Sequence, residues 1–158
     1  MSEAKIVRAG PDDAGELLTL QYAAFLSEAR VYERLDLPPL KQTFDELRSE
    51  LGDHPTWKAV VGTRIVGSIR VHREEDVLHV GRIMVAPDQQ GRGIGSRLLA
   101  AVEDDVPAGV ERLSLFTGFL STGNLRLYER VGYREVGRRP GPTGVMLVYL
   151  EKTLATPG

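Results

Sequence analysis

The chain alternates between short apolar runs and longer segments in which apolar residues recur every three or four positions. A run such as Ile65–Val71 is typical of a strand, whereas the spacing of Ile94, Leu98 and Val102 is typical of an amphipathic helix. Glycine, proline and aspartate lie between these segments and mark turns. The pattern predicts strands at residues 5–8, 57–61, 65–71, 77–85, 113–116, 133–138 and 145–151, and helices at 11–27, 43–51, 93–105 and 121–131.

Residues 28–42 separate the first two predicted helices. Pro38 and Pro39 are expected to break any regular element there, because proline lacks the N–H donor and restricts the residue before it. Thr43 and Glu46 have the spacing of a capping box, which predicts where the second helix begins. At the other end of the chain, residues 155–158 are expected to be frayed.

The order of elements, β-α-α-β-β-β-α-β-α-β-β, predicts an α/β fold with a mixed sheet. A helix crosses between the strand at residues 77–85 and the strand at 113–116, which makes these two strands parallel neighbours or near neighbours. In open α/β sheets, ligands bind at the carboxyl ends of such strands. We therefore expect the ligand beside the turn that follows Val85.

Composition limits the classes of protein to consider. With 158 residues, 42% of them hydrophobic and 27% charged, the chain is expected to form a single domain at residues 1–154. A net charge of −2 does not favour nucleic acid or an anionic membrane as a partner. Since there is no cysteine, disulfides, thiolate metal sites and an acetyl-cysteine intermediate are excluded. No signal pattern or membrane-spanning apolar run is present, so we expect a cytoplasmic protein. Separately, we expect no metal site.

The stretch at residues 90–96, QGRGIGS, carries the strongest chemical signal. Glycines at alternate positions allow a ligand to approach the backbone, and the free N–H groups of the following helix attract an anion. Arg92 adds a positive charge. The stretch therefore predicts a site for a phosphate or pyrophosphate group.

Two common phosphate-binding motifs do not fit this stretch. In the dinucleotide fingerprint a third glycine would stand at the position of Ser96, and the expected acidic residue, Glu111, precedes the next strand instead of closing it. The P-loop needs a Gly-Lys pair, and the stretch has no lysine. The ligand is thus neither a dinucleotide nor a P-loop nucleotide.

The pattern Q/R-x-x-G-x-G/A does fit, through Gln90, Gly93 and Gly95. Together with the preceding strand, it resembles the acetyl-coenzyme A loop of the GNAT (Gcn5-related) N-acetyltransferase superfamily. The resemblance extends over residues 6–150 and implies the GNAT fold with acetyl-CoA as acyl donor. The cofactor-binding residues that it implies are Ile83, Met84, Val85, Gln90, Gly91, Arg92, Gly93, Ile94, Gly95, Ser96 and Asn124.

A second motif at residues 124–133, NLRLYERVGY, resembles the family signature N…lYe..GF. Asn124 and Tyr128 are four residues apart and so lie on one face of a helix. The resemblance implies that Tyr128 is the general acid that protonates the coenzyme A sulfur. One departure affects Asn124: many members carry their asparagine seven positions before the tyrosine, where this chain has Ser121. Asn124 then either contacts the pantetheine arm or caps the helix.

An acceptor amine must lose a proton before it attacks a thioester. At pH 7 an alkyl amine with a pKa of about 10.4 is neutral in about one molecule per 10³, which corresponds to about 4.6 kcal/mol. A base can relieve this cost. The sequence offers His79, whose residue type titrates nearest to neutral pH, and two glutamates, Glu28 and Glu33.

The acceptor itself is not identified by the sequence. Tyr22, Phe25, Tyr32 and Trp57, with the acidic residues between 28 and 50, have the composition of a pocket for a cationic amine and equally of an ordinary amphipathic surface. The loop around Pro38 favours a closed site and therefore a small-molecule primary amine. Two alternatives remain, namely a protein N-terminus or lysine as acceptor and a non-catalytic acyl-CoA-binding module.

The last predicted strand, at residues 145–151, is apolar enough to be a free edge of the sheet. Pairing of this edge between two copies would give a homodimer.

Overall fold

A seven-stranded mixed sheet runs through residues 3–154, the part of the chain that the computed structural model describes. Its strand order is β1-β2-β3-β4-β5-β7-β6, and only β4 and β5 are parallel. The strands are β1 (Lys5–Ala9), β2 (Thr56–Val61), β3 (Arg64–Glu74), β4 (Val77–Val85), β5 (Arg112–Gly118), β6 (Arg134–Pro140) and β7 (Met146–Thr153).

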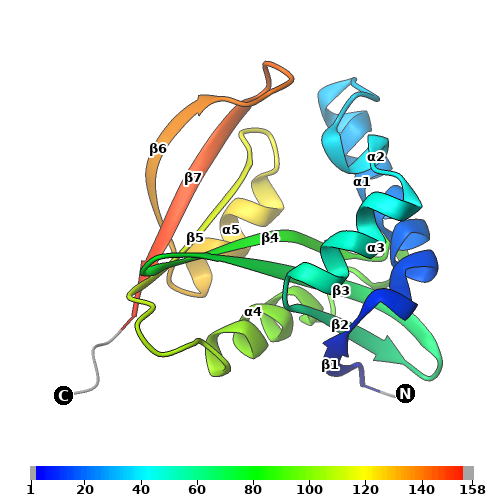
Figure 1. Ribbon diagram of the computed structural model, residues 1–158. Coiled ribbons are helices and arrows are strands. Elements are labelled where there is room, and N and C mark those ends of the chain that lie inside the picture. Colours follow the sequence, from blue (N-terminus) through cyan, green and yellow to red (C-terminus); the bar gives the residue numbers. More distant parts are fainter. Residues whose placement is uncertain (1–2, 155–158) are drawn as a thin grey trace.

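Helices lie on both faces of the sheet. Figure 1 shows α4 below strands β2 to β4, and α1 and α3 above them. The α-helices are α1 (Ala14–Tyr32), α2 (Pro38–Lys41), α3 (Phe44–Asp53), α4 (Ile94–Asp104) and α5 (Thr122–Arg130), with short 3₁₀ helices at Pro11–Asp13 and Pro87–Gln89. Because both of its faces are covered, the first half of β3 is buried at five consecutive positions, Ile65 to Ile69, instead of at alternate ones.

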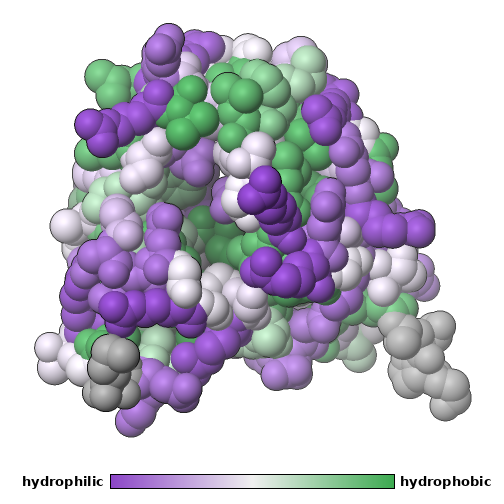
Figure 2. Space-filling view, turned by 180° about the vertical axis from the view of Figure 1, so that it is seen from behind, coloured by the Kyte–Doolittle hydropathy of each residue, from purple (hydrophilic) through white to green (hydrophobic). Residues whose placement is uncertain are grey.

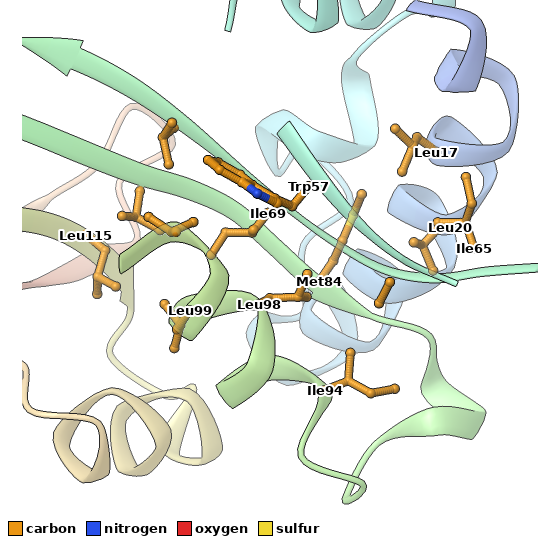
Figure 3. Packing of buried hydrophobic residues seen from close by; sticks show 14 of the residues in the cluster. Leu17, Leu20, Trp57, Ile65, Ile69, Met84, Ile94, Leu98, Leu99 and Leu115 are labelled. Atoms are coloured by element: carbon orange, nitrogen blue, oxygen red, sulfur yellow. The ribbon is translucent and has the colours of Figure 1, made fainter. Parts of the chain in front are cut away.

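The core lies between these layers, as Figure 3 shows. Leu98 and Leu99 of α4 lie on one side of the strands, and Leu17 of α1 lies on the other. Ile69 of β3 and Met84 of β4 fill the space between the two helices. This packing fixes the carboxyl end of β4 against the first turns of α4, which is where the glycine-rich stretch connects them.

The centre of the sheet opens where β4 and β5 diverge. The two strands pair at only three positions, from Val77↔Arg112 to His79↔Ser114. Beyond His79, β4 continues against β3 and β5 continues against β7. The edge of β4 that faces β5 therefore has backbone groups without a strand partner, and such groups need another partner if they are buried.

Most of the sequence-based expectations about the fold are confirmed. The mixed sheet forms, β4 and β5 are parallel neighbours, and Thr43 and Glu46 form the capping box. The prediction that residues 28–42 contain no regular element was wrong. Helix α1 continues to Tyr32, and Pro38 begins the one-turn helix α2, because proline is well tolerated in the first turn, where its missing N–H is not needed.

The last strand is not an edge of the sheet, contrary to the prediction. β7 pairs with β5 on one side and with β6 on the other, so the edge strands are β1 and β6. The apolar composition of β7 reflects this central position. A homodimer stays a prediction, and it can no longer be derived from β7.

Within residues 3–154 no helix is both long and apolar enough to cross a membrane. The same residues contain no group of three or more histidine, aspartate or glutamate side chains arranged to hold a metal ion. The expected fraying of residues 155–158 lies outside the described residues.

Candidate active site

The glycine-rich stretch joins β4 to α4 through two glycines in the left-handed region, Gly91 at φ +78° and Gly93 at φ +77°. Side chains are disfavoured in this conformation, so glycine is the residue type that fits. Gly93 is the N-cap of α4, and no side chain caps the helix there. The first N–H groups of α4 are therefore free to bind an anion, and the helix dipole favours one.

A cavity of about 400 Å³ lies over this helix start; we call it the glycine-loop cavity. Its walls come from β4, the glycine-rich stretch, α1 and α5, and Figure 2 shows the hollowed surface from behind. The absence of a side chain at Gly95 allows α4 and α5 to approach each other closely, because a Cβ there would lie only 2.9 Å from Cδ2 of Leu127 on α5.

β4 carries a bulge beside this cavity. Ser68 and Arg70 of β3 are two residues apart, but their partners Met84 and Gly81 on β4 are three apart. Arg82, within the bulge, has a φ of +49°. A bulge leaves one residue unpaired and turns its neighbours. The bulge lies between Gly81 and Met84, just beyond His79, where the pairing of β4 with β5 ends.

A second cavity, of about 300 Å³, adjoins the first. We call it the hairpin cavity, because the β6–β7 hairpin and the α1–α2 segment enclose it. The two cavities share four lining residues, namely Phe25, Glu28, Ile83 and Asn124. A ligand in the glycine-loop cavity and another in the hairpin cavity can therefore meet beside these residues.

The extension of α1 beyond Ser27 builds the shared wall. Phe25, Glu28 and Tyr32 are spaced by three and four residues, so they lie on one face of the helix, and all three line the hairpin cavity. Of the aromatic residues expected to form an acceptor pocket, Tyr22 and Trp57 do not line either cavity. Tyr22 hydrogen-bonds the carbonyl of Gln42, and Trp57 is buried in the core.

Glu28 is held by a short chain of hydrogen bonds. Its Oε2 accepts from the Ser121 hydroxyl at 2.6 Å, and that hydroxyl accepts in turn from Tyr32 at 2.7 Å, since its own proton is given to Glu28. The Tyr32 oxygen also accepts from the backbone N–H of Leu120 at 3.0 Å. The network fixes Oε2 of the carboxylate and leaves Oε1 outside it.

Gly118, at the end of β5, makes room for this network. A Cβ at Gly118 would overlap the Tyr32 hydroxyl. We expect Gly118→Ala to displace Tyr32 and to lower the free energy of unfolding by about 1–3 kcal/mol, through overpacking and lost hydrogen bonds. Urea unfolding measures this change. Gly137→Ala is the matched control, because a Cβ there meets nothing within 4 Å, and an equal effect in both variants would contradict the proposed fit.

Tyr128 lies on α5, one turn after Asn124, and lines the hairpin cavity. It is 2% exposed and is the only residue of α5 that is buried among those described. Burial raises the pKa of its phenol, and Tyr133 and Glu28 raise it further. The side chain therefore stays protonated through the physiological pH range and can donate its hydrogen.

Asn124 faces both cavities and is held to the sheet by a hydrogen bond from its Nδ2 to Oγ1 of Thr117, 3.3 Å long, on β5. Ser121, which occupies the family's usual asparagine position, lines the glycine-loop cavity and supports Glu28. The hydroxyl that stands at that position therefore belongs to the site through its hydrogen bond to Glu28.

The structure brings together nearly all residues that the sequence singled out for cofactor binding. Arg92 is the exception, since it is exposed beside the cavity and does not line it. The lining residues from that prediction are Ile83, Met84, Val85, Gln90, Gly91, Gly93, Ile94, Gly95, Ser96 and Asn124.

His79 does not reach the site. It lies in the paired half of β4, its side chain is 44% exposed, and its Nε2 lies 3.0 Å from Oε2 of Glu74. It stacks with His72, which in turn contacts His54, and lines neither cavity. The geometry gives His79 no access to an acceptor amine.

Many of the other lining residues were not predicted, and several of these are polar. Gln89 and Arg130 line the glycine-loop cavity, and Arg82 and Thr117 line the hairpin cavity. The position of Gln89 next to the motif was a usable signal. The other three come from separate elements, so no local pattern marks them.

The fold and the site together define a class of protein. A sheet that opens between two parallel strands, with a glycine-rich turn leading into an uncapped helix at the opening, is the architecture expected of an acyl-CoA N-acyltransferase. The chain belongs to the acetyltransferase (GNAT) domain family, since that family's model matches residues 27–154. This confirms the resemblance inferred from the two motifs.

Known proteins share part of the sequence or the whole fold. An IAA acetyltransferase from Azospirillum brasilense is 34% identical over 91 residues, which cover 56% of this chain and 59% of that protein. The ribosomal-protein-S18-alanine N-acetyltransferase of Escherichia coli superposes with a TM-score of 0.79 at 18% identity, covering 98% of this chain and 96% of that one. The PaiA N-acetyltransferase of Thermoplasma acidophilum, in complex with coenzyme A, gives 0.78 at 15% identity, covering 98% and 100%. At identities of 18% and 15%, the two structures show the shared fold alone.

Proposed function

We propose that this protein transfers an acetyl group from acetyl-CoA directly to a primary amine of a small molecule. The observation that carries the proposal is the pair of adjoining cavities, one over the anion-binding start of α4 and the other enclosed by α1, α2 and the β6–β7 hairpin. They meet beside Glu28 and Asn124. A donor and an acceptor bound in this way would react at the junction.

The glycine-loop cavity has the features that the donor needs. The free N–H groups of α4 would bind the pyrophosphate, with Arg92 and Arg130 supplying positive charge nearby. The unpaired edge of β4 at Ile83–Val85 would hold the pantetheine arm and polarise the thioester carbonyl. The coenzyme A in the Thermoplasma structure is consistent with this use of the shared fold. Acetyl-CoA would supply the acetyl group as an activated thioester.

The hairpin cavity favours a small acceptor over a protein chain. Arg34, just after α1, donates from Nη1 to the carbonyl of Thr143 in the β6–β7 hairpin at 2.5 Å, and Asp36 holds the same guanidinium at 2.6–2.8 Å. The bridge joins two segments that would otherwise flank an open groove. A peptide would have to break it, whereas a small amine fits in about 300 Å³.

Two residues would handle the protons. Glu28 would take one proton from the acceptor ammonium and pass it to solvent, so that the neutral nitrogen can form the new bond to the acetyl carbonyl carbon. The nitrogen would then give a second proton to Glu28 as the carbon–sulfur bond breaks. Tyr128 would give its O–H proton to the departing sulfur and regain one from solvent. We thus assign the base to Glu28 instead of His79, because Glu28 lines both cavities and His79 lines neither.

The first test is a calorimetric titration of the protein with acetyl-CoA, coenzyme A and NAD. We expect both coenzyme A species to bind and NAD not to bind. Gly93→Val should weaken coenzyme A binding at least tenfold, because a β-branched residue is strained at a φ of +77°.

Gly137→Val on β6 serves as the control for this titration, because it adds the same side chain at a position with open space and should leave binding unchanged. Failure of both coenzyme A species to bind the wild type would overturn the proposed function. Tight binding without turnover on any amine would favour a non-catalytic acyl-CoA-binding module.

A further inference from the structure

The hairpin cavity is lined by one acidic and one basic side chain. Among the described residues that line it, only Glu28 and Arg82 are charged at neutral pH, and the others are apolar or neutral polar. Glu28 comes from α1 and Arg82 from the bulge of β4. The cavity therefore offers a ligand one negative and one positive partner within about 300 Å³.

Arg82 is placed there at a cost to the fold. Its backbone is in the left-handed region, at φ +49°, which few residues other than glycine adopt readily. Its Nε is buried and has no hydrogen-bond partner within the described chain. Burial lowers the pKa of this guanidinium, which shows that its charge is poorly solvated. A buried donor of this kind is normally paired.

The neighbouring charges do not fully neutralise Arg82. Glu50 of α3 lies near two arginines, but its Oε2 contacts Arg70, at 2.7 Å from Nη2. The Glu50 charge favours the charged form of Arg82 as well, and Arg70 and Arg82 repel each other. Two guanidinium groups share the carboxylate of Glu50, so Glu50 does not fully neutralise Arg82.

We propose that the acceptor carries a carboxylate in addition to its primary amine, and that Arg82 binds this carboxylate while Glu28 faces the amine. The inference rests on the proposed function and narrows its substrate class to amino carboxylates. A guanidinium binds a carboxylate through paired hydrogen bonds, and Arg82 lines the cavity in which the carboxylate would lie. Because Glu28 lines both cavities, this orientation would direct the amine toward the acetyl donor.

The test compares acceptors with and without the carboxylate. The protein amino acids are screened, and the two best are then measured against their decarboxylated amines in wild type, Arg82→Met and Arg82→Lys. We expect the wild type to prefer the amino acids in kcat/KM. The preference should fall about 10- to 100-fold in Arg82→Met, the range of one charged hydrogen-bonded contact. Arg82→Lys should lose less, because lysine keeps the charge but not the paired donors of a guanidinium. The preference is the ratio of kcat/KM for an amino acid to kcat/KM for its decarboxylated amine in the same variant, so effects on the donor site cancel.

Binding gives a second readout that does not depend on turnover. The same amino acids are titrated by calorimetry into protein saturated with coenzyme A, and their affinity should fall in Arg82→Met by a similar factor. Arg138→Met, which removes an exposed guanidinium paired with Glu135 on β6, is the matched control and should leave both readouts unchanged. Removing a poorly solvated charge should not lower the melting temperature of Arg82→Met.

Two results would overturn the inference and leave the proposed function intact. One is a preference for amino acids that Arg82→Met retains. The other is acetylation of plain amines with no amino acid bound or acetylated. Failure of the proposed function looks different, because the protein would then bind no acetyl-CoA or would acetylate no amine at all, and the inference would fail with it.

Discussion

Replacing Tyr128 with phenylalanine is expected to lower kcat by about 10²- to 10⁴-fold, the usual range for loss of a positioned general acid. The ring stays in place and only the hydroxyl is lost, so the packing of this buried residue changes little. The affinity for acetyl-CoA should change little, because the pyrophosphate and most of the pantetheine arm would be bound in the glycine-loop cavity, which Tyr128 does not line. Steady-state kinetics and calorimetry together measure both quantities.

Tyr133→Phe is the control for this experiment. Tyr133 is also buried, its ring centroid lies 6.1 Å from that of Tyr128, and burial raises the pKa of its phenol as well, but it lines neither cavity. Removing the Tyr133 hydroxyl should leave kcat unchanged. Equal kcat values for the wild type and Tyr128→Phe would show that Tyr128 is only a core aromatic residue.

The raised pKa of Tyr128 also predicts a pH profile. A phenol whose pKa lies above its ordinary value of about 10 stays protonated at every pH below that value. Ionisation of Tyr128 should therefore cause no loss of kcat up to about pH 10. An alkaline decline below pH 9 that Tyr128→Phe abolishes would contradict its burial as a neutral phenol.

Replacing Glu28 with glutamine is expected to lower kcat/KM at pH 7 by about 10²-fold or more. Without a base, the reaction depends on the small fraction of amine that is already neutral, about one part in 10³ at pH 7. The deficit should shrink as the pH rises toward about 10, because that fraction grows. A pH series of kcat/KM for wild type and Glu28→Gln measures both effects.

Two control variants separate Glu28 from the other candidate bases. Glu33→Gln removes an exposed carboxylate that lines neither cavity, and His79→Gln removes the histidine near the far end of β4. Neither should change kcat/KM by more than about twofold if surface substitutions act as they usually do. If His79→Gln lost activity while Glu28→Gln kept it, the assignment of the base would be reversed.

The glycine-rich stretch shows why part of the site could be predicted. Gly91 and Gly93 stand two positions apart in the motif and act through local backbone geometry, namely positive φ and an uncapped helix start. Such features depend on residues next to one another in the chain. The spacing of Asn124 and Tyr128 is equally local, because one helical turn joins them.

The choice of a base shows the limit of the same reasoning. His79 was favoured by the chemistry of its side chain, but the pairing of β4 with β5 places it in the closed half of the sheet. Glu28 was a weaker candidate because it was expected to be a solvated charge at a helix end, whereas α1 continues past it to Tyr32. The contacts that extend α1 and hold Glu28, from Ser121 and Tyr32, join residues up to 93 positions apart.

The sequence by itself determined the family, the order of the strands and helices along the chain, and the glycine-rich turn before α4, because periodicity and short motifs are properties of neighbouring residues. Only the tertiary structure decided which strand lies at the edge, which carboxylate reaches the junction, and that Arg82 lies in a cavity with Glu28. These depend on long-range pairing and on a bulge in β4. Side chains from distant elements are brought together by packing of the whole chain, and no local pattern records the result.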